Sequence, residues 1–222
     1  PDAIVDSIKY IDKDNNYSKE LLNFKKKPNL PVMETKISKH VPRTTFILKI
    51  IKEIVDNDSN RKILLLSSRR DHIFYLKEEI IKHNIANGSV GIYIGGMLES
   101  DRDISTTKTI IIATYDMAQE GFDCKTLNTL ILTTPKKNII QAVGRILRQK
   151  KTERVVIPKI IDVCDCFSSF HNWNNIRDKY FRSKKYEINY YKYYNNQEVN
   201  NNQEVNNNQE VNNDHNYSSI NC

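Results

Sequence analysis

The spacing of hydrophobic residues predicts alternating strands and helices through the middle of the chain. Short continuous apolar runs, typical of strands buried on both faces, occur at 62–67, 90–94, 109–114, 129–133 and 155–163. Apolar residues recur at helical spacing between positions 46 and 54, and again after Asp71, which can cap a second helix. Strands separated by helical segments indicate an α/β domain with a mainly parallel sheet and helices on both faces.

The two ends of the chain differ from this middle part. The first residues are rich in Lys, Asn and Asp, with prolines that interrupt any long helix, so we expect a connecting arm. Residues 167–194 mix aromatic and basic side chains, which favours a helix packed on the domain. Stacking of these side chains on nucleic-acid bases is the alternative interpretation. A repeated polar NNQEV unit then predicts disorder, because it buries nothing. The expected organisation is an arm (1–42), an α/β domain (43–166), a helical extension (167–194) and a disordered tail (195–222).

Composition adds that the folded part is strongly basic. The formal net charge is +7, and it rises to +11 without the four acids of the tail. Such a charge favours polyanionic partners but does not identify one. No apolar run approaches the ~18 residues of a membrane span, and no signal segment opens the chain, so we expect a soluble intracellular protein without a membrane partner. The four cysteines form no CxxC pair, which argues against a zinc site or a disulfide framework.

The segment 138–149, NIIQAVGRILRQ, separates into an apolar and a polar face if it is one helix. Gln141, Arg145 and Arg148 follow at spacings of four and three, so they stack on the polar face, where Gly144 lets another molecule approach. Two guanidinium groups directed the same way can donate paired hydrogen bonds to phosphate oxygens, which predicts a phosphate clamp. A solvated polar face with two incidental arginines is the alternative.

A second candidate segment, 109–123, places Thr114 at the carboxyl end of a strand, followed by Gly121 and Asp123. A hydroxyl and backbone amides at the end of a strand can hold a phosphate. An acid after a glycine can accept a hydrogen bond from a ribose hydroxyl or from an arginine. Asp123 as an ordinary turn residue is the alternative.

Together these segments resemble the fifth and sixth motifs of superfamily 2 helicases, in the usual order and with a strand between them. LLLSSR at 64–69 is similar to the fourth motif, and Ile94-Gly95-Gly96 followed by Arg102 is similar to a GG…R stretch of the second motor domain. The resemblance covers about 43–165. The phrases ATYDMAQEGFD, LILTTPK and QAVGRILRQ most resemble helicases of large cytoplasmic DNA viruses and the poxvirus transcript-release helicase. A viral source would place the protein in the host cytoplasm or the virion.

The resemblance implies a RecA-like second motor domain, which closes over ATP and Mg²⁺ held mainly by a first, N-terminal domain. Arg148 is then the expected arginine finger and Arg145 its companion. The nucleotide side of the cleft would be lined by Gly121, Asp123 and Gln141. The backbone of DNA or RNA would be contacted by Ser67, Gly95, Gly96, Thr114 and Tyr115.

The sequence also departs from the pattern of a complete helicase. No GxxxxGK(S/T) phosphate loop and no DExx acid precede Arg43, so we expect this chain alone to hydrolyse ATP poorly or not at all. It begins at Pro1 rather than Met, which fits a C-terminal half that works with an N-terminal helicase domain in cis or in trans. The alternative is a stand-alone nucleic-acid-binding or regulatory module without ATPase activity. A nucleotide-binding oxidoreductase is disfavoured because no GxGxxG opens a strand-to-helix turn.

Overall fold

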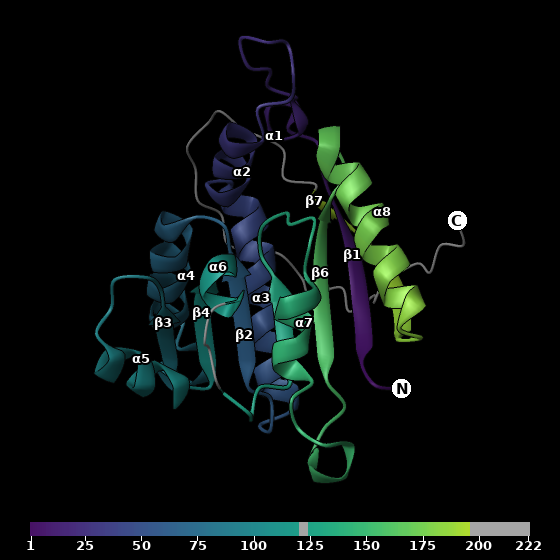
Figure 1. The fold of residues 1–222 in the computed structure, drawn as a ribbon. Helices are drawn as coiled ribbons and strands as arrows, with labels where there is room; N and C mark the ends of the chain where they lie inside the picture. Colours follow the sequence, from purple (N-terminus) through teal and green to yellow (C-terminus); the bar gives the residue numbers. More distant parts are fainter. Residues whose placement is uncertain (120–123, 196–222) are drawn as a thin grey trace, which may run out of the picture.

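The computed structural model describes residues 1–119 and 124–195, in which seven parallel strands form one sheet (Figure 1). The strands are β1 (Ile4–Asp12), β2 (Ile63–Ser67), β3 (Val90–Tyr93), β4 (Ile110–Thr114), β5 (Thr129–Leu132), β6 (Lys159–Asp165) and β7 (Glu187–Asn195). Their order across the sheet is β3-β4-β2-β5-β6-β1-β7. Because every pair is parallel, the carboxyl ends of all seven strands lie at one edge of the sheet. This confirms the predicted α/β class.

Helices cover both faces of the sheet and make three layers (Figure 1). They are α1 (Asn15–Ser18), α2 (Leu30–Ser38), α3 (Val41–Asn57), α4 (Arg70–Lys82), α5 (Glu99–Thr106), α6 (Tyr115–Gln119), α7 (Ile140–Ile146) and α8 (Ser168–Ser183), with short 3₁₀ helices η1 (Ile85–Gly88) and η2 (Lys151–Glu153). The helices α3 and α4 lie on one face, and α6 and α7 lie on the other. Within the described residues, no helix is both long enough and apolar enough to cross a bilayer.

The central strands are buried on both sides, which explains their unbroken apolar sequences. Ile63 and Leu65 of β2 belong to the core layer under α3 and α4. Leu64 and Leu66 belong to the layer under α6 and α7. Successive side chains of a strand point to opposite faces, so a strand covered by helices on both faces needs an apolar residue at every position.

The start of the chain joins the sheet instead of forming an arm outside it. Residues 4–12 form β1, which pairs with β6 on one side and β7 on the other, with Ile8 opposite both Val163 and Tyr191. Val5, Ile8 and Tyr10 of this strand are buried. The helix expected after residue 166 is present as α8, but it is followed by β7, which we did not expect. The predicted Asn-rich tail after Asn195 lies outside the described residues.

Two predicted elements are shorter than expected. The strand expected at 155–163 begins only at Lys159, directly after Pro158, whose carbonyl accepts a hydrogen bond from Ile4 N at 2.9 Å. The helix expected at 138–149 spans only Ile140–Ile146. The amide of Leu147 bonds the Gly144 carbonyl at 3.3 Å, a tight 3₁₀-type contact that closes the helix.

Two buried ion pairs connect helices to β6. Arg43 of α3 donates two hydrogen bonds of 2.8 Å to the Asp165 carboxylate and a third of 2.6 Å to the Thr133 carbonyl after β5. The hydroxyl of Tyr17 donates to the same carboxylate. Arg177 of α8 pairs with Asp162 at 2.9 Å. These pairs fix α1, α3 and α8 against the strand ends that carry the candidate site.

Candidate functional site

The two candidate arginines do not project together from one helix. The Arg145 side chain is buried, at 7% exposure, and its Nε donates to the Ala118 carbonyl of α6 at 2.5 Å. Arg148 is exposed and lies two residues beyond the end of α7 at Ile146. The prediction of two exposed arginines on one helix face is therefore wrong, because α7 ends early and the Arg145 side chain points inward. The inward direction is toward the segment after Thr114, so the two motif segments do meet.

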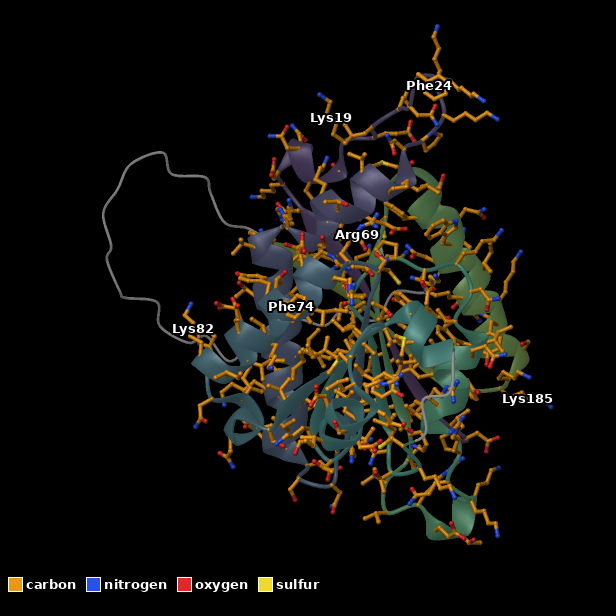
Figure 2. All side chains as sticks on the ribbon, turned by 60° about the vertical axis from the view of Figure 1, so that its left-hand side comes forward. Lys19, Phe24, Arg69, Phe74, Lys82 and Lys185 are labelled. Carbon is orange, nitrogen blue, oxygen red and sulfur yellow. The ribbon has the colours of Figure 1, made fainter. Side chains whose placement is uncertain are left out.

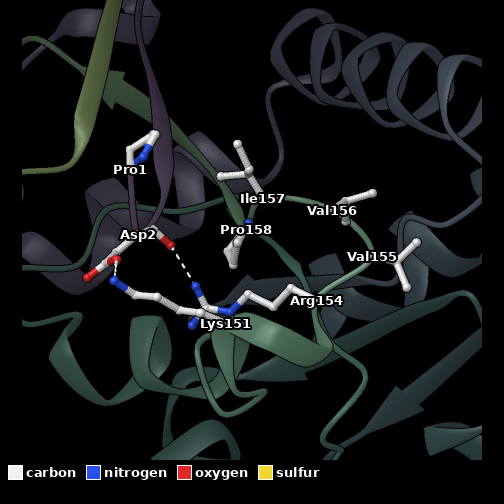
Figure 3. Close-up of a pocket in the computed structure, with 8 residues that line it drawn as sticks. All are labelled: Pro1, Asp2, Lys151, Arg154, Val155, Val156, Ile157 and Pro158. Carbon is white, nitrogen blue, oxygen red and sulfur yellow. Dashed lines mark hydrogen bonds and ion pairs between the residues drawn. The ribbon is translucent and has the colours of Figure 1, made fainter.

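The backbone that carries Arg148 is held from both sides by Arg154. Its guanidinium donates to the Leu147 carbonyl at 3.3 Å and to the Gln149 carbonyl at 3.0 Å. A third hydrogen bond, of 3.2 Å, reaches the Asp2 carbonyl just before β1 (Figure 3). The Asp2 carboxylate also pairs with Lys151. Arg148 is thus presented on a short segment whose backbone position is fixed, although no sequence motif pointed to Arg154.

Thr114 and Tyr115 stand at the carboxyl end of β4, but their side chains are differently placed. The Thr114 hydroxyl is partly buried and accepts a hydrogen bond from Met117 N at 3.3 Å, within the first turn of α6. Tyr115 is buried, and its hydroxyl donates to the Thr134 carbonyl at 2.6 Å. The Tyr115 side chain is therefore not placed to contact nucleic acid, since its ring and hydroxyl are both occupied inside the fold.

Ser67 is also buried rather than exposed to a ligand. Its hydroxyl accepts from Arg69 N at 3.2 Å and shares a hydrogen bond of 3.1 Å with Nδ1 of His72. These bonds shape the turn from β2 into α4. The expectation that the Ser67 side chain contacts nucleic acid is wrong, because a residue at the end of a strand can turn its hydroxyl into the following helix.

The buried His72 predicts a pH dependence of stability. Burial, with a smaller contribution from the Arg43 charge, lowers the pKa of His72 to about 3. The unfolded chain still takes up a proton near pH 6.5, so it binds more protons than the fold between about pH 6.5 and 3. Stability is therefore fully present above pH 6.5 and falls on acidification by up to about 1.4 kcal/mol per pH unit from this group. Urea unfolding at pH 7 and 5 measures this loss, and His72→Gln should show a flatter pH dependence; an equal slope in both proteins would contradict it.

Gly95 and Gly96 are exposed at the end of β3, as expected for backbone that meets a ligand. Gly96 has φ +86°, a left-handed conformation that side chains disfavour, and a Cβ there would meet no atom within 4 Å. Arg70 at the start of α4 donates to the Gly95 carbonyl and so supports this turn, a contact that the sequence did not indicate. Gln141 is exposed on α7. Gly121 and Asp123 lie outside the described residues.

Three of the nucleic-acid candidates share the carboxyl edge of two neighbouring strands. Gly95 and Gly96 follow β3, and Thr114 ends the adjacent β4. Functional groups of parallel α/β sheets lie at this edge. Within residues 1–119 and 124–195, no group of three or more His, Cys, Asp or Glu could hold a metal ion. The edge thus offers backbone groups, a hydroxyl and basic side chains.

Comparisons with known sequences point to one family. Residues 46–150 match the family described as helicase conserved C-terminal domain. A protein of Acanthamoeba polyphaga mimivirus, named as an ATP-dependent RNA helicase, is 41% identical over 188 residues, which cover 84% of this chain and 33% of that protein. A similarly named protein of African swine fever virus is 29% identical over 135 residues, covering 57% of this chain and 26% of its own length. This chain thus spans a third or less of these relatives.

Comparisons with solved structures agree on the fold. T4 UvsW superposes with a TM-score of 0.66 at 19% identity, covering 87% of this chain and 42% of UvsW. Domain 2 of the DEAD-box helicase Mss116p bound to an RNA duplex gives a TM-score of 0.50 at 13% identity, covering 84% of this chain and 63% of that one. At such identities the likeness concerns the fold alone, which is RecA-like. By sequence, residues 46–150 of this chain are therefore a helicase conserved C-terminal domain.

Proposed function

We propose that this chain is the second motor domain of an ATP-dependent nucleic-acid helicase or translocase, in which Arg148 reaches the phosphates of ATP held by an N-terminal domain. One observation carries the proposal: Arg148 is exposed on a segment whose backbone is held on both sides by Arg154. A guanidinium stays charged and donates in a fixed fork to phosphate oxygens. The viral relatives are about three to four times longer than the matched part, which leaves room for an N-terminal domain.

The other residues around α7 take supporting roles in this proposal. Arg145 is a positioning residue, because it joins α7 to α6 through the Ala118 carbonyl. Gln141, Gly121 and Asp123 stay proposed for the nucleotide side of the cleft. ATP supplies the phosphoryl group that is transferred to water. Both ATP and Mg²⁺ would be held mainly by the N-terminal domain.

Nucleic acid would bind along the carboxyl edge of β3 and β4. Backbone groups of Gly95 and Gly96 and the Thr114 hydroxyl suit contacts to a phosphate backbone, which carry no base identity. Ser67 and Tyr115 contribute only by shaping the turns around them. The names of the viral relatives favour RNA as the substrate.

The experiment compares ATP hydrolysis by this chain alone and by this chain joined to an N-terminal motor domain encoded upstream of Pro1. That domain is identified by its phosphate loop and its DExx acid. We expect negligible hydrolysis by the chain alone and hydrolysis stimulated by single-stranded nucleic acid in the joined protein. Stimulated hydrolysis by the chain alone, or none by the joined protein, would contradict the proposal.

The second candidate is a stand-alone nucleic-acid-binding or regulatory module. The charge of +11 without the tail acids supports binding to a polyanion in the absence of a motor. This candidate predicts tight, steeply salt-dependent binding of single strands by the isolated chain, together with an upstream coding region that lacks a phosphate loop.

A further inference from the structure

The loop between α1 and α2 projects from the molecule and carries an exposed aromatic ring among three lysines. This segment, residues 22–28, is called the Phe24 loop here. Phe24 is 90% exposed, and Lys25, Lys26 and Lys27 are exposed beside it. Figure 2 shows Phe24 at the far end of the loop, directed away from the domain. A phenylalanine this exposed gains nothing from burial in the core, so its ring is available to a binding partner.

The Phe24 loop is an ordered structure. Leu22 and Pro28 form an antiparallel bridge at its base. Asn23 then closes the loop. Its backbone N–H donates to the Lys27 carbonyl at 2.8 Å, and its backbone carbonyl accepts from Lys26 N at 2.9 Å. The Asn23 side-chain oxygen accepts from Lys25 N at 2.9 Å and from Lys27 N at 3.2 Å. The backbone that carries Phe24 is therefore held in place, which lowers the conformational cost of binding through this loop.

The surroundings of the loop are basic. Residues 21–30 contain no acid, and Lys19 is exposed nearby. The carboxylate of Glu20 accepts a hydrogen bond from Ser168 at 2.5 Å, so it is engaged with the start of α8. The ammonium of Lys25 lies 5.5 Å from the centre of the Phe24 ring. The tip thus combines one flat apolar face with several positive charges.

The loop also lies on the functional edge of the domain. It leads into α2, whose first turn accepts a hydrogen bond of 2.5 Å from Arg69 at the Pro31 carbonyl. Arg69 also pairs with Glu34 at 3.4 Å. Because Arg69 follows β2, these contacts fix α2 and the Phe24 loop beyond the carboxyl ends of the strands (Figure 1). Gly95, Gly96 and Thr114 belong to the same edge.

We propose that the Phe24 loop is a nucleic-acid contact in which the Phe24 ring stacks on an unpaired base while the three lysines bind flanking phosphates. One aromatic ring among lysines suits a polyanion with flat bases. A protein partner would need a larger apolar contact area to bind stably. The inference rests on the proposed function, because it adds a base contact to the backbone contacts along the sheet edge. Stacking on a base tolerates any sequence, as the proposed motor requires.

The test is fluorescence anisotropy with the whole 222-residue chain and a labelled single-stranded 20-mer of uridine, over a series of salt concentrations. We expect Phe24→Ala to weaken binding by about 5- to 100-fold, and Phe24→Trp to bind like the wild type. Replacing Lys25, Lys26 and Lys27 with serine should reduce the slope of log affinity against log salt by about 2. The matched control is Phe74→Ala, which removes a ring of 43% exposure from α4 and should change nothing.

The outcomes separate this inference from the proposed function. Wild-type binding that survives both Phe24→Ala and the lysine replacement would overturn the inference and leave the proposed function standing; the tip would then serve a protein partner or none. An equal loss in Phe74→Ala would also overturn it. If the wild-type chain binds no single strand at all, the inference fails, while the ATP hydrolysis of the joined protein still decides the motor function.

Discussion

Replacing Arg148 with alanine is expected to lower nucleic-acid-stimulated ATP hydrolysis by about 10³- to 10⁵-fold in a protein that contains this chain and its N-terminal motor domain. In the proposed role, the Arg148 guanidinium stabilises the charge that develops on the transferred phosphoryl group. Alanine leaves that charge without a hydrogen-bond donor from this domain. Steady-state hydrolysis with saturating single strands measures the loss. Binding of the strands should be nearly unchanged, since the segment that carries Arg148 is held beside Asp2, before the start of β1, whereas Gly95 and Gly96 follow the end of β3.

Two further variants make the Arg148 result specific. Arg148→Lys keeps a charge but loses the planar fork, so it should recover only part of the rate. Arg182→Ala removes an exposed arginine from α8 and should leave hydrolysis at the wild-type rate. Unchanged hydrolysis in Arg148→Ala would remove this residue from the proposed role.

Replacing Asp165 with asparagine is expected to destabilise the chain by about 3–5 kcal/mol. The carboxylate accepts two hydrogen bonds of 2.8 Å from Arg43, and both side chains are buried. The substitution leaves the Arg43 charge in the interior without its counter-ion, which is the costly half of breaking a buried pair. Urea unfolding of the wild type and the variant at pH 7 gives the difference in the free energy of unfolding.

A surface pair provides the control for Asp165→Asn. Asp56 pairs with Lys52 on α3, and both side chains are more than half exposed. Asp56→Asn should therefore change the free energy of unfolding by about 0–1 kcal/mol. A loss below about 1 kcal/mol in Asp165→Asn would show that Arg43 finds another partner in the fold.

The central strands could be predicted from the sequence because their burial is complete on both faces. β2, β4 and β5 have apolar runs that leave little choice of structure. β1 could not be predicted in the same way, because Asp6, Ser7 and Lys9 interrupt its apolar residues. Its strand conformation depends on β6 and β7, which lie far along the chain. Local patterning carries no signal of such distant partners.

The candidate site shows the same limit at the level of side chains. Residue types and their order identified the motifs, and the structure brings Arg145 to α6 after Thr114. Helical spacing did not predict that α7 ends at Ile146, which separates Arg145 from Arg148. The burial of individual side chains was not predictable either. Ser67 and Tyr115 carry hydroxyl groups that suit a phosphate contact, but both side chains are buried. Hydrogen bonds to the Ala118 and Thr134 carbonyls hold Arg145 and Tyr115 inside the fold, and both bonds depend on the assembled structure.

The place of β1 has a consequence for how the chain matures during translation. Among the seven described strands this one is made first, yet its neighbours β6 and β7 are made last. On one side its backbone donors and acceptors stay unpaired until β6 has left the ribosome, and on the other side until β7 has. Pairings between such distant segments form slowly because a long loop must close first. Until those two strands emerge, a nascent chain would expose β1 as an unpaired strand, which is open to pairing with other chains.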